Sequence, residues 1–367
     1  MLRQATNTRP KQGPTTSRRR WLRLGDTALL WGVRSSAAVI LLMMASLVIV
    51  LTLAALPSIK MYGLGFLVGT QWRPNEIERE QRDATGAVVM EDGEAVLEII
   101  PPEFSAAPMI FGTAVSASLA LIFAVPLSLG AALFLVRVAP RWRIAAPLSF
   151  LIEFLAAIPS LAYGIWGLFV LAPLLQTHVE PALRSALGGI GFLRWMFFEE
   201  IKTGGETLVR EIPLTGKDML CGSLILAVMI IPIITAISRD VLRAVPRVQV
   251  EGTVAMGATW WQSSWGMLRY SRSGLFGAVM LGLARAAGET MAVTMVIGNV
   301  NKISVSPFAP SQTMASLLAN GFADASSTMH RAAMMEVALV LLLMSLVLNI
   351  VARYFVVGNQ SRTAGAH

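Results

Sequence analysis

Apolar residues are gathered along the chain into long runs that alternate with shorter polar stretches. A bilayer-spanning helix needs about 20 predominantly apolar residues, and each run is close to or above this length. The pattern therefore predicts an all-α integral membrane protein with six transmembrane helices. The runs cover about residues 35–56, 112–136, 148–175, 220–238, 274–298 and 332–357.

The composition agrees with this class, since 55% of the 367 residues are hydrophobic, 14% are charged and the mean hydropathy is +0.63. The first run of about 22 residues exceeds the roughly 7–15 apolar residues of a secretory signal. No small-residue cleavage site follows it, so we expect a retained transmembrane helix at 35–56.

Basic residues predict how the helices are oriented. If the N-terminus is cytoplasmic, the four inside segments hold 18 Lys and Arg, and the three outside segments hold 11. The positive-inside rule then favours a cytoplasmic N-terminus and C-terminus. The expected domains are a basic cytoplasmic tail at 1–34, the first transmembrane helix at 35–56, an external loop at 57–111, a five-helix domain at 112–357 with a cytoplasmic loop at about 239–273, and a cytoplasmic tail at 358–367.

The long outside stretches, 57–111 and 176–219, are mixed in charge and hold no catalytic signature. In the first of them, apolar and polar residues alternate around "AVLEII", which predicts a small excursion that contains strands. We interpret both stretches as solvated loops on the outer face.

Several function classes find no support in the sequence. No G-x-x-x-x-G-K-[ST], H-E-x-x-H, G-x-S-x-G or paired-cysteine motif is present. Three widely spaced histidines and a single cysteine give no basis for a metal site. Eight basic residues precede the first apolar run, where they act as an orientation signal, so the net charge of +8 does not indicate nucleic-acid binding. We expect no enzyme activity, no metal and no cofactor.

A basic, tryptophan-rich loop separates the fourth and fifth runs and reads "SRDVLRAVPRVQVEGTVAMGATWWQSSWGMLRYSRSG", residues 238–274. Pro246, Gly252 and Gly257 interrupt it. One interpretation is an amphipathic helix on the lipid interface, where Trp and Arg are favourable. The other is a pair of short helices joined by a glycine turn, which would present a surface to a cytoplasmic partner.

Two charges stand near the middle of the fifth run, in "GLARAAGETMAVTMVIGN", residues 282–299. Arg285 and Glu289 are four residues apart, so on a continuous helix they would share one face. A charge at the bilayer centre costs about 2.5–3.5 kcal/mol on insertion scales, so this face should look into a bundle or a watery path. The pair is either an internal salt bridge or a functional site, to which the Thr290 hydroxyl could add a hydrogen bond.

Three stretches together resemble the permeases of binding-protein-dependent ABC importers. Glu251, six residues ahead of Gly257, resembles the E-A-A-x-x-x-G loop of these permeases. The 282–299 stretch is similar to the fifth span of the phosphate importer permeases of the PstC family. "EFLAAIPSLAYGIWGLF", residues 153–169, is similar to their third span. The stretches occur in the family's order, and the similarity covers roughly residues 35–357.

The loop departs from the family pattern in its first half and at its end, where the family's I-x-L-P is here "MLRYSRSG", one residue shorter and without a proline. Gly252 and Thr253 stand where the family's loop has two alanines.

The resemblance implies a type I ABC importer permease fold in the bacterial cytoplasmic membrane and half of a translocation pathway for inorganic phosphate. A PstA-like permease would supply the other half, and a dimer of a PstB-like ATPase would hydrolyse ATP. A PstS-like binding protein would deliver phosphate from outside. Glu251 and Gly257 would belong to a coupling helix that docks on the ATPase.

The resemblance also implies that Arg285 and Glu289 take part in phosphate passage. A guanidinium offers a fixed fork of N–H donors suited to phosphate oxygens. At neutral pH phosphate keeps a P–OH proton that a carboxylate can accept, whereas fully ionised sulfate has no such donor. Glu289 would thereby favour phosphate and partly cancel the charge of Arg285.

Three alternatives stay open at this point. The chain could be the PstA-like partner permease, a permease of a sulfate or molybdate importer, or an anion transporter that works without ATP. The cytoplasmic loop with Glu251 and Gly257 favours an ATP-coupled protein.

Overall fold

A computed structural model describes residues 16–80, 90–91, 94–95, 97–203 and 206–364. The chain divides into two units, and the boundary falls after Leu53. Helix α1 (Thr16–Tyr62) contains an apolar stretch, Asp26–Tyr62, that is long enough to span a membrane, which confirms the first predicted helix. The predicted tails lie outside the described residues at 1–15 and 365–367.

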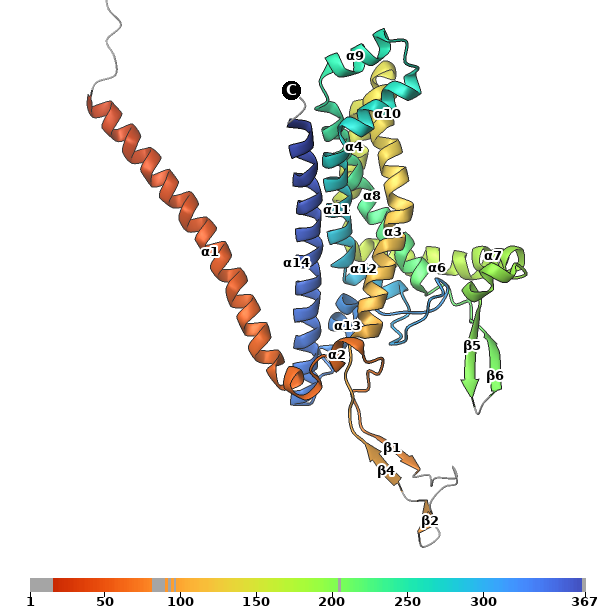
Figure 1. The fold of residues 1–367 in the computed structure, drawn as a ribbon. Helices are drawn as coiled ribbons and strands as arrows, with labels where there is room; N and C mark the ends of the chain where they lie inside the picture. Colours follow the sequence, from red (N-terminus) through yellow and green to blue (C-terminus); the bar gives the residue numbers. More distant parts are fainter. Residues whose placement is uncertain (1–15, 81–89, 92–93, 96, 204–205, 365–367) are drawn as a thin grey trace, which may run out of the picture. The chain divides into compact units, whose positions relative to one another are not determined.

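A bundle of long helices forms the centre of the second unit (Figure 1). Small residues allow close packing in it: Ala117, Ala120 and Ala124 of α3 are buried in one cluster with Ala227 of α8. Ser128 of α3 donates a hydrogen bond to the Ile231 carbonyl of α8 at 3.2 Å. The bundle helices are α3 (Ala107–Leu133), α8 (Met219–Arg243), α11 (Arg272–Ala287) and α14 (Thr328–Ala364).

The third predicted span, 148–175, is not a single helix. Helix α4 (Ala145–Ala156) ends before Pro159, which cannot donate a backbone hydrogen bond and disfavours a helical residue before it. A continuous helical segment then runs from Ser160 to Leu187, and α6 and α7 within it lie across the direction of α3 (Figure 1). Its parts are α5 (Ser160–Trp166), the π-helical turn η3 (Gly167–Leu171), α6 (Ala172–Leu174), the π-helical turn η4 (Leu175–Val179) and α7 (Glu180–Leu187).

The fifth predicted span, 274–298, is also interrupted. Helix α11 ends at Ala287, and a separate short helix, α12 (Met291–Val296), follows. The Glu289 amide bonds the Ala286 carbonyl three residues back, so the last turn tightens as the helix ends at Gly288. In the described part of the chain, five helices are long and apolar enough to span a membrane, not six. The all-α membrane fold itself is confirmed.

Short strands and helices lie at one end of the bundle, opposite α9 and α10 (Figure 1). The predicted strand-bearing excursion is confirmed, because β1 pairs antiparallel with β4 and β2 with β3. A second hairpin, β5–β6, lies in the 176–219 stretch. The elements at this end are α2 (Gly65–Val68), β1 (Ile77–Glu80), β2 (Met90–Glu91), β3 (Glu94–Ala95), β4 (Leu97–Ile100), η5 (Gly191–Met196), β5 (Phe198–Thr203), β6 (Glu206–Glu211) and α13 (Met314–Gly321).

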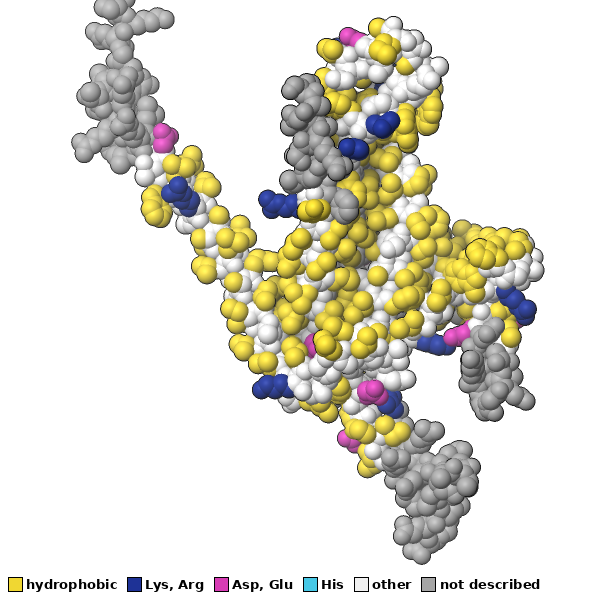
Figure 2. All heavy atoms as spheres, viewed as in Figure 1, with side chains coloured by type: hydrophobic (Ala, Val, Ile, Leu, Met, Phe, Trp, Pro, Cys, Tyr) yellow, Lys and Arg dark blue, Asp and Glu magenta, His cyan; other side chains and the backbone are white. Residues whose placement is uncertain are grey.

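The opposite end of the bundle holds two short helices (Figure 1). They lie between α8 and α11 along the chain, and the C-terminal end of α14 lies on the same side. In the view of Figure 2, hydrophobic side chains cover the middle of the second unit, and most charged side chains lie toward its two ends. The elements at this end are η1 (Phe134–Val138), η2 (Ala139–Trp142), α9 (Arg247–Ala255) and α10 (Trp260–Tyr270).

Candidate functional site

The break between α11 and α12 holds the predicted charged pair. Arg285 is on the last turns of α11 and its side chain is exposed, whereas Glu289 and Thr290 lie after the helix end and are partly buried. The prediction that Arg285 and Glu289 share one helix face is therefore wrong, because the helix ends between them. The described residues include no ion pair between their side chains.

Tyr163 is a further residue of this site, one that the sequence did not single out. Tyr163 is next to Gly164, which packs against α12 directly after the break. The Tyr163 hydroxyl donates a hydrogen bond to the Leu155 carbonyl at 2.8 Å, near the end of α4. The available signal was a tyrosine four residues after Pro159, whose polar tip needs a partner in an apolar stretch.

Helix α5 holds α12 in place through a close contact. A Cβ atom at Gly164 would lie 2.8 Å from Met295 Sδ and 3.0 Å from Ala292 Cα, so only glycine allows α5 to approach α12 this closely. Ala292 is itself fully buried. The segment that carries Tyr163 therefore also positions the residues that follow the break.

The hydroxyl groups after the break bond to their own backbone. Thr290 Oγ1 donates to the Gly288 carbonyl at 3.3 Å, and Thr294 Oγ1 donates to the Thr290 carbonyl at 2.6 Å. Membrane helices use serine and threonine in this way. Each hydroxyl oxygen keeps acceptor capacity, which suits a protonated ligand group better than a bare anion.

The loop between α8 and α11 confirms the prediction of two short helices joined by a glycine turn. Gly257 has a φ of +84°, a conformation in which an L side chain is strained. Helix α10 begins with a capping box, in which Thr259 accepts from the Gln262 amide and Gln262 accepts from the Thr259 amide. Glu251 lies on α9 and is exposed.

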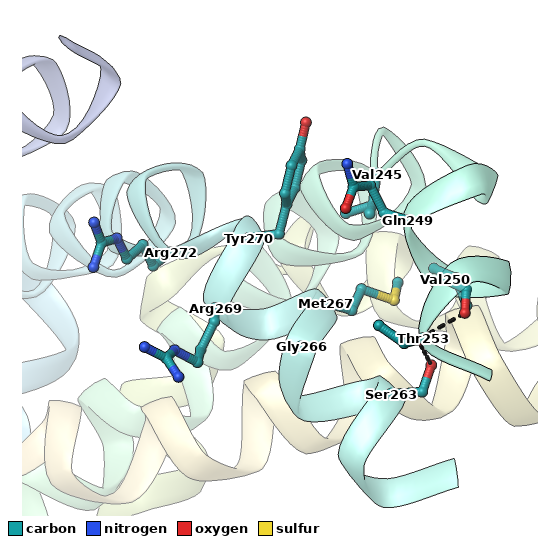
Figure 3. Close-up of a pocket in the computed structure, with 10 residues that line it drawn as sticks. All are labelled: Val245, Gln249, Val250, Thr253, Ser263, Gly266, Met267, Arg269, Tyr270 and Arg272. Atoms are coloured by element: carbon teal, nitrogen blue, oxygen red, sulfur yellow. Dashed lines mark hydrogen bonds between the residues drawn. The ribbon is translucent and has the colours of Figure 1, made fainter. Parts of the chain in front are cut away.

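A cleft of about 360 Å³ lies between α9 and α10 (Figure 3). Thr253 crosses it, bonding the Val250 carbonyl at 2.7 Å and Ser263 Oγ at 3.1 Å. Figure 3 shows that the side chains of Arg269, Tyr270 and Arg272 point away from this bridge. The Thr253–Ser263 hydrogen bond fixes α9 relative to α10.

The loop is also attached to the bundle. Arg137, in the π-helical turn η1 that follows α3, donates to Ser263 Oγ at 3.4 Å, and its guanidinium lies 5.7 Å from the Trp260 ring centroid. Met267 of α10 is buried in a cluster with Leu242 and Leu275 from the ends of α8 and α11.

The outward surface of the loop is apolar for an exposed segment. Val248 is 77% exposed, Met256 90% and Trp261 62%. Exposed apolar patches of this kind mark protein or membrane contacts. This surface, which we call the α9–α10 surface, is distant from the break, because Arg285 follows Arg272 by 13 residues, or about 20 Å of helix.

A buried cation joins α4 to α8. Arg239 is 8% exposed, and its guanidinium bonds Glu153 of α4 and Asp240 of α8, each at 2.9 Å. These contacts fix the end of the helix that precedes Pro159.

Comparison with known proteins agrees with this architecture. Residues 124–358 match the family described as binding-protein-dependent transport system inner membrane component, which is more than half of the chain. The chain is therefore a multi-pass membrane component of a binding-protein-dependent transport system.

Within that class the chain belongs to the PstC family of phosphate transport system permease proteins. It is 38% identical to the Haemophilus influenzae protein of that name over 88% of this chain and 90% of the relative. It is 34% identical to the Mesorhizobium japonicum protein of the same name over 90% of this chain and 89% of that relative. Among solved structures, a MetNI methionine ABC transporter matches with a TM-score of 0.43 and 16% identity, over 69% of this chain and 93% of that chain.

Proposed function

We propose that this chain is the permease subunit of an ATP-driven importer of inorganic phosphate and forms half of the pathway. The observation that carries the proposal is an exposed guanidinium, Arg285, beside a helix break in an apolar segment of a PstC-family chain. Facing lipid, this charge would cost about 2.5–3.5 kcal/mol. A second permease and a watery pathway would remove that cost.

The side chains at the break suit an anion that binds weakly and is then released along the pathway. Arg285 supplies fixed N–H donors for phosphate oxygens, and Glu289 supplies an acceptor for a P–OH proton. The carboxylate also weakens the hold of the cation on the anion, since a pathway site must release what it binds. Thr290 offers a hydroxyl oxygen next to Glu289, and Tyr163 lies on the helical segment that packs against α12.

The remaining subunits follow from the family and the α9–α10 surface. Glu251 and Gly257 would dock on one subunit of a PstB-like ATPase dimer, which hydrolyses ATP, so that this chain is not itself an enzyme. A PstA-like permease would face Arg285, and a PstS-like binding protein would bind outside. The alternatives of a partner permease, a sulfate or molybdate permease and an ATP-independent transporter have weaker support, because relatives along nine-tenths of the chain are phosphate permeases.

The orientation is part of the proposal. The α9–α10 surface and the C-terminal end of α14 lie at one end of the bundle, and the hairpins lie at the other (Figure 1). The bias in basic residues supports a cytoplasmic position for the first end, with the N-terminus also inside. In a Cys221→Ser background, a cysteine at residue 261 should react only from inside and one at residue 76 from outside. Labelling of both from the same side would contradict this orientation.

Arg285→Lys tests the function. The change keeps the charge but removes the planar fork, so radiolabelled phosphate uptake by the complete transporter should fall at least about tenfold while the complex assembles. Arg141→Lys makes the same chemical change at an exposed turn and should leave uptake unchanged.

The double variant Arg285→Leu with Glu289→Leu separates transport from a structural salt bridge. Removal of both charges together should leave an assembled complex that carries no phosphate. Uptake near the wild-type rate in this variant would show that the pair has no part in transport.

A further inference from the structure

A pair of acidic side chains lies where α7 meets the start of α8, away from the helix break. Glu180 is the first residue of α7, and Asp218 caps α8 by accepting the Cys221 amide at 2.8 Å. Both residues are fully buried. The transport and docking roles proposed above use neither of them.

Several oxygen atoms of these carboxyl groups contact no solvent and accept no hydrogen bond. Both Glu180 oxygens and Asp218 Oδ2 are buried without a hydrogen-bond partner. The two groups are close enough to interact through their side chains. Two ionised carboxylates in such a place repel each other and lose their hydration, whereas a single proton between them supplies the missing donor.

No neighbouring cation in the described part of the chain takes over this neutralising role. Apart from the far end of α8, the other titratable or charged side chains on α7, α8 and the turns next to them are His178, Arg184, Lys217 and Cys221, and Lys302 lies on the loop that follows α12. Arg184 and Lys302 form ion pairs with Glu211 and Glu199. The side chains of His178 and Lys217 are exposed, and Cys221 is a buried thiol.

Titration of Asp218 agrees with this geometry. Burial away from solvent raises the pKa of Asp218 to about 8, against the lowering effect of the Cys221 amide, and the Glu180 carboxyl adds to the rise. The folded state therefore binds a proton that the unfolded chain releases near pH 4.

We propose that Glu180 and Asp218 form a proton-binding site, in which one shared proton joins α7 to the start of α8. The adjacent loop already fits closely against the same helical segment. Gly216 has a φ of +66°, and a Cβ atom there would lie 2.1 Å from the Ala172 carbonyl oxygen. Loss of the proton would leave two buried anions at this joint and loosen it.

The joint is linked to the break by one continuous helical segment. Ser160–Leu187 carries Glu180 near one end and Tyr163 and Gly164 near the other, where it holds α12. Release of the proton would therefore weaken the support of the residues after the break and slow transport at high pH. This consequence rests on the proposed function, whereas the shared proton does not.

Infrared difference spectroscopy of the complete transporter in lipid nanodiscs tests for the proton. The wild type minus Glu180→Gln spectrum should show the carbonyl band of a protonated carboxyl group at neutral pH, and the band should vanish as the pH rises through about 8. In Glu180→Gln the amide N–H replaces the proton as the donor to Asp218, so the joint should persist. Glu211→Gln, which alters an exposed acid, should retain the wild-type band.

A spectrum without this band would contradict the proposal. A melting temperature that rises on addition of Na⁺ or Ca²⁺ at high pH, with no band at neutral pH, would instead assign the pair to a metal cation and contradict the proposal too.

Phosphate uptake at two pH values tests the consequence. The ratio of wild-type to Glu180→Gln uptake should fall at least about twofold from about pH 7 to about pH 9. The ratio cancels the titration of phosphate itself. A constant ratio together with the infrared band would refute the link to transport and leave the shared proton in place. The fall in uptake expected for Arg285→Lys tests the proposed function, and it does not depend on the infrared band or on the uptake ratio.

Discussion

Replacing Gly257 by alanine should weaken docking on the ATPase while the membrane helices still fold. Gly257 has a φ of +84°, and no other atom lies within 4 Å of the position that a Cβ would occupy. The strain therefore comes from the backbone alone and amounts to about 1–2 kcal/mol. If the turn must keep this conformation to present the α9–α10 surface, the docking-competent fraction falls about 5–30-fold.

Gly252→Ala is the matched control. It adds the same methyl group to the same loop, also into open space, but within helix α9. Alanine is favoured over glycine there by about 1 kcal/mol. It also restores one of the two alanines in the family's loop pattern. Alanine therefore disfavours the native backbone conformation at residue 257 and favours it at residue 252, and the two free-energy changes differ by about 2–3 kcal/mol.

The assay is ATP hydrolysis by the reconstituted complex, stimulated by the phosphate-loaded binding protein, together with the melting temperature of the membrane subunits. Gly257→Ala should lower the stimulated rate without a change in melting temperature, and Gly252→Ala should preserve both. Wild-type stimulation in Gly257→Ala, or an equal loss in both variants, would refute the argument.

Two further changes probe the packing around the sites. Gly112→Ala should destabilise the protein by about 1–3 kcal/mol, because the new Cβ would lie 2.1 Å from the Gln312 carbonyl oxygen, whereas Gly130→Ala on the same helix meets no atom within 4 Å. The measurement is the melting temperature of each variant, and equal values would contradict the close contact. Glu153→Gln and Asp240→Asn should each cost less than about 1 kcal/mol, since both carboxylates are more than half exposed. The double variant should cost more than the sum, because it leaves the buried Arg239 guanidinium without a counter-charge, and strict additivity in a double-mutant cycle would contradict this coupling.

Hydropathy was sufficient to locate the membrane helices but not to define their ends. The first, second, fourth and sixth runs correspond to helices that are long and apolar enough to span, and the third run overlaps a fifth such helix, Ser160–Leu187. The third and fifth runs are apolar along their length, and a window average does not register the interruptions at Pro159 and at Gly288. The residue before a proline and a single mid-run glycine are weak signals, since both also occur inside continuous membrane helices.

The glycine turn could be predicted because local chemistry decides it. Gly257 and the cap at Thr259 specify a turn and a helix start within three residues. Tyr163 and the Glu180–Asp218 pair could not be predicted, because each depends on which segments meet. Glu180 and Asp218 are 38 residues apart, and in sequence they are indistinguishable from the solvated acids of the same loop.

The packing of α11 indicates where a displacement of the α9–α10 surface would change the structure of the helix break. Gly274 and Gly282 place α11 so close to α8 that a Cβ atom would lie 2.7 Å from Val241 Cγ1 and 2.6 Å from Ile234 Cδ1. The α9–α10 surface is in turn joined to α8 and α11 by the buried cluster around Met267. A displacement imposed on that surface would therefore move α11 and α8 together, up to Ala287. Beyond that residue α12 packs against α5 as well as against α8, so any difference in position between α11 and α12 falls at Gly288–Thr290, where Glu289 lies. A continuous fifth helix would carry Arg285 and Glu289 as one rigid pair, whereas a broken helix allows the distance between the cation and the carboxylate to change when the partner moves.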